Sequence, residues 1–258
     1  MRGLAGKVCI IAGGATGIGR GTAIRLAEEG ANVVVGDFNI AGAREAAALA
    51  EAKGKAAGGR AIATQFDMAD DASVGALVKS AVDHFGGLDA MHVNAHDMSV
   101  VPQDGDALEV SLAVFDRTIQ VGLRGHLLCT RHALPQMLKR GGGAIVYTTS
   151  GAAFMGEPTR VSYGIAKAGL LALTRHVARR WGKEGIRANA IAPGLILTEQ
   201  LLKQPGTEEL QTMVLTHVPS TRLGAPGDIA AMVAMLFSDD GAWVTGQAIA
   251  VDGGSTMR

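Results

Sequence analysis

The chain has 258 residues, of which 48% are hydrophobic and 19% charged, which is enough apolar material for a sizeable core and excludes a disordered chain. Lys and Arg together number 24, as do Asp and Glu, so the net charge is zero and a polybasic nucleic-acid binder is excluded. Cys9 and Cys129 lie in apolar stretches, and we expect buried thiols in a cytoplasmic protein. The longest apolar run, Ile229–Phe237, is less than half of a membrane span, so we expect no membrane partner.

Short β-branched runs alternate with long alanine-rich stretches along the chain. The predicted strands are Lys7–Ala12, Asn32–Gly36, Ala61–Phe66, Ala90–Val93, Ala144–Thr148, Arg187–Ala192 and Ala248–Val251. The predicted helices, with apolar residues three or four apart, are Gly17–Glu29, Ala41–Ala57, Ala72–Phe85, Leu112–Arg140, Ser162–Lys183 and Asp228–Phe237. Gly30, Gly86 and Gly185 each follow a helix, where a left-handed C-cap is favoured.

This alternation predicts a parallel sheet covered by helices on both faces, which is a doubly wound α/β fold. The chain contains no linker-like segment and no shift in composition, so we expect a single domain over residues 1–258. Residues 195–222 fit the alternation least well. We expect them to form a substrate lid over the functional site.

A glycine-rich turn follows the first predicted strand and opens the first predicted helix. Gly13, Gly17 and Gly19 let the backbone turn tightly and approach a pyrophosphate, whose charge is met by the helix N-terminus. The strand–turn–helix context is the one that dinucleotide binding requires, so we favour that interpretation. The alternative is a plain tight turn.

Asp37 ends the second predicted strand, close to the place at which an acidic residue hydrogen-bonds a ribose 2′-hydroxyl. A carboxylate there repels a 2′-phosphate, and no Lys or Arg lies between Gly13 and Gly19 to attract one. The expected cofactor is therefore NAD and not NADP. The alternative is that Asp37 merely caps the helix beginning near Ala41.

Three polar residues predict acid–base chemistry near the fifth strand. Ser150 ends that strand, and Tyr163 and Lys167 stand four apart on a predicted helix, so both side chains point the same way. An ammonium beside a phenol favours the phenolate, and we expect the pKa of Tyr163 to be lowered. Such a tyrosine can take a proton from an alcohol while hydride leaves for a nicotinamide, and Ser150 can hydrogen-bond the substrate oxygen. The alternative is an ordinary surface Tyr–Lys pair.

With these motifs in place, the whole chain resembles the classical short-chain dehydrogenase/reductase family. Residues 12–19 are similar to the family's glycine-rich motif, residues 93–96 to its Asn-Asn-Ala-Gly, and Ser150, Tyr163 and Lys167 to its Ser and Tyr-x-x-x-Lys. Residues 193–198 resemble its Pro-Gly segment, and residues 245–254 its last strand. The resemblance implies a seven-stranded parallel sheet of Rossmann type, an NAD-dependent dehydrogenase or reductase acting on a secondary alcohol or ketone, and a homotetramer.

The resemblance also implies which residues contact the cofactor. Asp67 and Met68 fall where the family contacts adenine, although Asp67 can also be an ordinary loop acid ahead of a helix, and Thr198 is placed for the nicotinamide carboxamide. We expect no metal site, and we expect Ser150, Tyr163 and Lys167 to be catalytic. The expected cofactor-binding residues are Gly13, Thr16, Gly17, Ile18, Gly19, Asp37, Asp67, Met68, Asn94, Ala95, Tyr163, Lys167, Pro193, Gly194, Ile196 and Thr198.

Three positions depart from the family's pattern. Ala12 replaces a Thr, with the loss of a hydrogen bond that helps hold the turn near the fourth strand. His96 replaces a Gly beside the expected nicotinamide ribose, and it either tolerates the turn or lines the pocket. Gly122 stands where the family has an Asn that positions a water in a proton relay from the lysine. Either a further water fills the vacated space and continues the relay, or the relay is broken.

A second functional class stays open, namely a catalytically silent NAD-binding protein that senses the cofactor or scaffolds an oligomer. The intact Ser150, Tyr163 and Lys167 favour the enzyme, whereas His96 and Gly122 favour the rival. For the enzyme, Met98, Met155, Glu157 and the lid are expected to surround the substrate. The helix Leu112–Arg140 and the helix carrying Tyr163 are expected to pack against partner copies.

Overall fold

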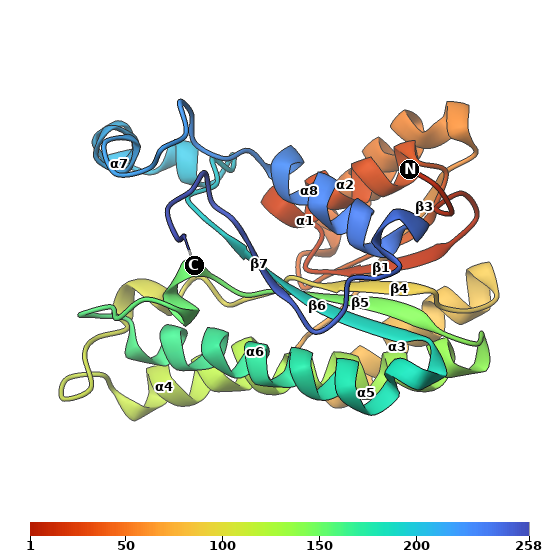
Figure 1. The fold of residues 1–258 in the computed structure, drawn as a ribbon, viewed down its shortest axis with the longest axis horizontal. Helices are drawn as coiled ribbons and strands as arrows, with labels where there is room; N and C mark the ends of the chain where they lie inside the picture. Colours follow the sequence, from red (N-terminus) through yellow and green to blue (C-terminus); the bar gives the residue numbers. More distant parts are fainter. Residues whose placement is uncertain (258) are drawn as a thin grey trace.

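Seven strands form one parallel sheet in the order β3-β2-β1-β4-β5-β6-β7 in the computed structural model, which describes residues 1–257 (Figure 1). The strands are β1 Val8–Ala12, β2 Asn32–Asp37, β3 Arg60–Gln65, β4 Ala90–Val93, β5 Gly143–Thr148, β6 Ile186–Pro193 and β7 Ala248–Val251. Each predicted strand ends within one residue of the observed strand. The central strands are buried on both faces, which is why they read in the sequence as continuous apolar runs.

Helices cover both faces of the sheet, as predicted. The helices are α1 Gly17–Glu28, α2 Ile40–Gly54, α3 Asp71–Phe85, α4 Leu112–Ile119, α5 Gly125–Lys139, α6 Val161–Trp181, α7 Thr207–Leu215 and α8 Pro226–Phe237. Figure 1 shows α1, α2 and α8 on one side of the sheet and α3, α4, α5 and α6 on the other. Gly30, Gly86 and Gly185 have φ values of +85°, +82° and +82°, so the predicted left-handed C-caps are confirmed.

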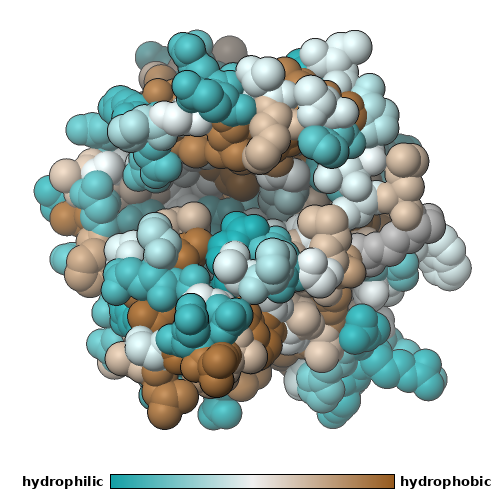
Figure 2. Space-filling model, turned by 90° about the vertical axis from the view of Figure 1, so that its left-hand side faces the viewer, coloured by the Kyte–Doolittle hydropathy of each residue, from teal (hydrophilic) through white to brown (hydrophobic). Residues whose placement is uncertain are grey.

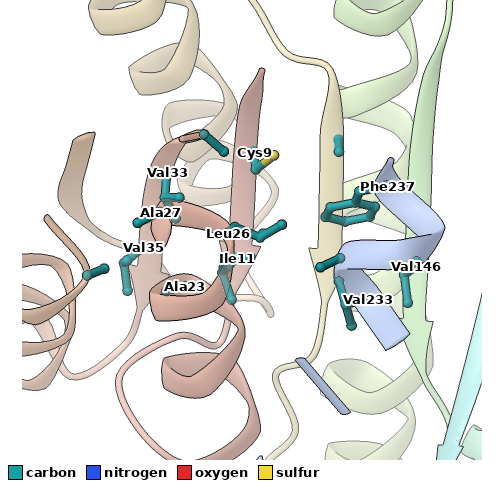
Figure 3. Packing of buried hydrophobic residues seen from close by; sticks show 14 of the residues in the cluster. Cys9, Ile11, Ala23, Leu26, Ala27, Val33, Val35, Val146, Val233 and Phe237 are labelled. Atoms are coloured by element: carbon teal, nitrogen blue, oxygen red, sulfur yellow. The ribbon is translucent and has the colours of Figure 1, made fainter. Parts of the chain in front are cut away.

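Small side chains let the α1 layer lie close to the sheet. Ala23, Leu26 and Ala27 of α1 are completely buried together with Val33 of β2 and Phe237 of α8 (Figure 3). A Cβ at Gly54 of α2 would lie only 2.5 Å from the Ala27 carbonyl oxygen. This close approach explains the high content of glycine and alanine.

Two segments differ from the predicted elements. The predicted helix Leu112–Arg140 is divided by a π-helical turn, Gln120–Arg124, which has Gly122 at its centre. The lid contains a short helix, α7, that its irregular sequence did not indicate. A π turn accommodates one additional residue while the apolar spacing on either side persists, so periodicity alone does not reveal it.

Cys9 and Cys129 are both free and buried, which confirms the expectation for the two thiols. Burial raises the pKa of Cys9 to about 12, so this thiol is unreactive. Within residues 1–257, no helix is both long enough and apolar enough to cross a membrane.

Candidate active site

The candidate residues converge on the carboxyl-terminal edge of the sheet. These residues follow the carboxyl ends of β1, β2, β3, β4, β5 and β6. Because the strands are parallel, all of these ends lie on one side of the sheet. The strand order reverses direction between β1 and β4, which is where doubly wound sheets bind ligands. Figure 2 looks onto the side of the molecule that carries these ends and the lid, and shows a hollow there.

The glycine-rich turn has the backbone that a pyrophosphate cradle requires. Gly13 and Gly17 have φ values of +92° and +53°, in the left-handed region that favours glycine. A Cβ at Gly17 would lie 3.0 Å from Cγ2 of Thr198, so a side chain there would intrude between the turn and the segment after β6. Thr16 is the N-cap residue of α1 but makes no side-chain capping bond, which leaves the first amides of the helix without a side-chain acceptor. These features fit a dinucleotide phosphate.

Asp37 is fixed beside this turn at the end of β2. Its Oδ2 accepts a hydrogen bond from the Ala15 N–H at 3.0 Å, and its Oδ1 accepts one from the Asn39 N–H at 3.0 Å. The N-cap of α2 is Asn39, whose side chain accepts from the Gly42 N–H. Asp37 is therefore not the cap of this helix. Each of its oxygens retains a lone pair for a ribose hydroxyl.

Asn94 joins the glycine-rich turn to the ends of β4 and β5. Its amide donates to the Gly13 carbonyl at 2.9 Å, and its Oδ1 accepts from the Thr148 hydroxyl at 3.0 Å. The Ala12 carbonyl accepts from the backbone N–H groups of Asn94 and Ala95. The turn is therefore held to β4 without the hydroxyl that is missing at Ala12.

Several expected cofactor-binding residues direct their side chains into the protein. Met68 and Ile196 are 4% and 7% exposed and belong to the core, so only their backbones remain for a ligand, and Ile18 is partly buried against the core. Asp67 is part of a local turn in which its Oδ1 accepts from the Ala69 N–H. Asp67 thus has the contacts expected of a loop acid ahead of a helix. Within these contacts, no protein group donates a hydrogen bond to its Oδ2.

The segment after β6 forms the opposite wall of the site. Pro193 ends β6 and pairs with Val251 of β7, and the Gly194 N–H donates to the Val251 carbonyl. A Cβ at Gly194 would lie 2.8 Å from the Asp252 Cα, so only glycine fits this close contact. The Thr198 hydroxyl accepts from the Leu201 N–H at 3.2 Å, which fixes the start of the lid.

Ser150, Tyr163 and Lys167 are brought together, as predicted. The Ser150 hydroxyl lies close enough to that of Tyr163 to lower its pKa, and it accepts from the Ala152 N–H at 3.2 Å. Lys167 lies one helical turn after Tyr163, with its Nζ 5.5 Å from the tyrosine ring centroid. The lysine is 2% exposed, and its Nζ donates to the Thr148 carbonyl at 2.9 Å.

The expected lowering of the pKa of Tyr163 is wrong. Burial raises the pKa of Tyr163, and this effect outweighs the lowering by the Ser150 hydroxyl and the Arg160 charge. Burial also lowers the pKa of Lys167 to about 7. The ammonium is directed at a carbonyl of β5 instead of the phenol, so its influence on Tyr163 is weak.

One residue that sequence analysis missed, Asp104, holds the start of α6. The N-cap residue, Arg160, has φ +61° and caps nothing with its side chain. The cap comes instead from the buried Asp104, whose carboxylate accepts from the Ser162 N–H, the Ser162 hydroxyl and the Tyr163 N–H. Asp104 is distant in sequence and lies in no motif, so no local signal identifies it. It fixes the backbone of the helical turn that carries Tyr163.

His96 and Gly122, the two unusual residues, are in contact. A Cβ at Gly122 would lie 2.7 Å from Cε1 and 2.8 Å from Nδ1 of His96. The space that the sequence leaves at Gly122 is therefore filled by an imidazole ring, and the expectation that an extra water fills it is wrong. The same ring stands edge-on to Tyr163, with ring centroids 5.0 Å apart, so His96 lines the site.

The burial of Lys167 predicts a pH-dependent loss of stability. Its pKa is about 7 in the folded protein and 10.5 in its usual state, so the unfolded chain binds more protons between these values. The contribution of Lys167 to the free energy of unfolding therefore rises between pH 7 and pH 10.5. Below pH 7 the buried amine is charged, and it destabilises the folded protein to the full extent. We expect Lys167→Met to raise Tm at pH 6.5 and to raise it less at pH 9.5. Scanning calorimetry at both values checks this, with the exposed Lys183→Met as control. Equal changes at both values contradict the assignment.

Comparison with known proteins gives a consistent result over almost the whole chain. A family model described as enoyl-(acyl carrier protein) reductase matches residues 13–256. A probable short-chain type dehydrogenase/reductase of Bradyrhizobium diazoefficiens is 43% identical, over 96% of this chain and 87% of the relative. The 3-oxoacyl-(acyl-carrier-protein) reductase FabG of Staphylococcus aureus is 37% identical, over 97% and 98% of the two chains.

Levodione reductase, a solved structure, superposes with a TM-score of 0.88 at 32% identity and covers 97% of both chains. The resemblance noted in the sequence is thereby confirmed, and the findings favour an oxidoreductase over a silent binding protein. With the sheet order and the glycine-rich turn described above, they establish that this chain belongs to the short-chain dehydrogenase/reductase family.

Proposed function

We propose that the protein is an NAD(H)-dependent oxidoreductase that interconverts a secondary alcohol and a ketone, with Tyr163 as general acid and base. The observation that carries the proposal is the placing of Ser150 beside Tyr163, with Lys167 on the next turn of α6, at the sheet edge that also bears the glycine-rich turn. The nicotinamide, when bound, supplies or accepts the hydride.

The side chains of this chain then handle the oxygen and its proton. Ser150 and Tyr163 both present hydroxyls to the substrate oxygen, so that developing negative charge is met by two donors. In oxidation, Tyr163 takes the alcohol proton, and in reduction it returns one to the carbonyl oxygen. A bound nicotinamide cation and the Lys167 ammonium would both favour the phenolate, which offsets the effect of burial on its pKa.

Asp37 supports the choice of NAD. Its carboxylate is held rigidly beside the turn, where it accepts ribose hydroxyls and repels a 2′-phosphate. The nearest cation on α1 is Arg20, which is engaged by Glu199 and by the Ala15 carbonyl. The exposed residue after Asp37 is Phe38, which carries no charge. These features disfavour an additional phosphate beside the turn.

The entrance of the site favours a substrate with an apolar part. Met98 and Met155 are 62% and 47% exposed and follow β4 and β5, on the same edge as Tyr163. The lid, residues 195–222, adds exposed Leu202 and Met213. We propose that these side chains close over the substrate. Glu157 is paired with Arg160 and contributes less than the methionines.

Tyr163→Phe is expected to lower kcat by about 100-fold or more, because it removes the proton-transferring oxygen and little volume. Steady-state rates with a panel of secondary alcohols and ketones check this, and NADH binding measured by fluorescence should not change. Tyr147→Phe is the matched control, since it is the other tyrosine of the sequence and its buried hydroxyl bonds Thr130. Retention of most activity by Tyr163→Phe would remove the tyrosine from the mechanism.

Wild-type protein is expected to prefer NAD(H) over NADP(H). The substitution Asp37→Ala is expected to reduce this preference by about tenfold, because it deletes hydrogen bonds to a charged group. The ratio of kcat/KM for the two cofactors measures this. Asp83→Ala, at an exposed position on α3, should leave the ratio unchanged. Equal use of both cofactors by the wild type contradicts the proposal.

We also propose that the protein is a cytoplasmic homotetramer. The helices α4, α5 and α6 expose apolar side chains that the sheet does not cover, namely Leu112, Leu127, Leu138 and Ile165. Burial of such positions between copies removes them from water. Light scattering at micromolar concentration should give a mass of four chains, and a monomeric mass contradicts the assembly.

A further inference from the structure

The imidazole ring of His96 lies between the π turn and α6. Neither Nδ1 nor Nε2 of His96 has a hydrogen-bond partner, although both atoms are buried. A ring that served only to fill this space would be better placed there without polar atoms. The two nitrogens therefore point to hydrogen-bonded groups that the protein itself does not supply.

The surroundings of this ring are those of the acid–base machinery. Its edge contact with Tyr163 has an interplanar angle of 83°. A Cβ at Gly122 would also lie 3.3 Å from the Ala166 Cβ, so the ring, Gly122 and α6 meet at one point. The charges that act on the ring are the Lys167 ammonium and the Asp97 carboxylate, and Asp97 is paired with Arg117.

The ring is neutral at physiological pH. Burial and the Lys167 charge lower the pKa of His96 to about 3. A neutral imidazole has one N–H donor and one bare nitrogen acceptor, so it can receive a proton on one side and release another on the opposite side. The amide of an asparagine also offers a donor and an acceptor. His96 thus restores, from the end of β4, the hydrogen-bonding capacity that Gly122 lacks.

We propose that His96 is the positioning residue of the proton path between Lys167 and solvent, and that it occupies the space left free by Gly122. This inference rests on the proposed function, because it assigns a role in the regeneration of Tyr163. The proposed proton path requires a polar side chain at position 96 or at position 122. It does not accommodate both, because a Cβ at Gly122 would lie 2.7 Å from the His96 ring.

The proton balance in the reduction direction is as follows. Tyr163 gives its proton to the carbonyl oxygen, and Lys167 restores the phenol by loss of one N–H proton. A solvent proton then adds to the bare nitrogen of His96, while the opposite N–H proton passes through hydrogen-bonded solvent to Lys167. The ring is neutral before and after, with its tautomer exchanged, and a second exchange with solvent resets it.

The first test exchanges the two side chains. Gly122→Asn and His96→Gly are each expected to lower kcat at least about tenfold, the first by a clash with the ring and the second by loss of the relay. The double variant, which carries both changes, should recover to within about threefold of the wild type. A double variant that is no better than the worse single variant overturns the pairing.

The second test separates hydrogen bonding from space filling. His96→Phe keeps a ring and its edge contact but has no nitrogen, so kcat should fall and the solvent isotope effect should rise, with KM unchanged. The control is His176→Phe, because His176 is exposed and makes a similar edge contact with Trp181, at 5.7 Å. In His96→Gly, added imidazole should restore kcat, whereas thiophene, a ring without nitrogen, should not. Wild-type kcat and isotope effect in His96→Phe overturn the relay.

A third test does not depend on turnover. The ¹⁵N resonances of the His96 ring should shift in Lys167→Met, because the proposed path connects the ring with the ammonium, and should not shift in Lys183→Met. Unchanged resonances in both variants overturn the proposal even when no substrate is found. Failure of wild-type turnover together with a shift in Lys167→Met contradicts the proposed function and leaves the link between His96 and Lys167 established.

Discussion

The burial of the Lys167 ammonium is the most demanding interaction in the fold. A charged amine in a site with 2% exposure is unfavourable unless its hydrogen bonds are supplied, and the Thr148 carbonyl at the end of β5 supplies one. The Thr149 hydroxyl in turn donates to the Lys167 carbonyl at 2.8 Å. These two bonds connect β5 with α6 in both directions. The position of Tyr163, one turn earlier, and of Ser150, two residues after Thr148, follows from this connection.

The same interaction connects the catalytic side to the glycine-rich turn. The Thr148 hydroxyl accepts from His92 at 2.8 Å and donates to Asn94, whose amide holds the Gly13 carbonyl. A continuous set of hydrogen bonds therefore runs from the turn after β1 to the end of β5. Because each member is hydrogen-bonded to the next, a change at one member affects the geometry of both halves of the site.

The sequence predicted the elements whose signals are local. Strands such as Val8–Ala12 are buried on both faces, so continuous apolar residues identify them, and the turns after them carry glycines that their backbone requires. Tyr163 and Lys167 share a helix face because of their spacing alone. The sheet edge at which these motifs meet follows from parallel connectivity. Accordingly, the sheet, the glycine-rich turn and the catalytic group could be predicted from short segments.

The features that escaped prediction depend on contacts between distant segments. Asp104 caps α6 across 58 positions of sequence, and no pattern near Arg160 reveals that its helix lacks a local cap. The side chains of Met68 and Ile196 point into the core, which a motif position does not specify. The effect of Lys167 on Tyr163 was overestimated because spacing does not show where the Nζ finds its acceptor.

His96 and Gly122 show why a departure from a family pattern is best judged with its neighbours. Taken singly, a histidine in place of a glycine suggests a crowded turn, and a glycine in place of an asparagine suggests a lost relay. A Cβ at position 122 would lie 2.7 Å from the imidazole. The histidine ring therefore occupies space next to the place where a side chain at position 122 would begin. A side chain at position 122 would displace the ring from this place. The polar ring thus fills a space that borders Tyr163.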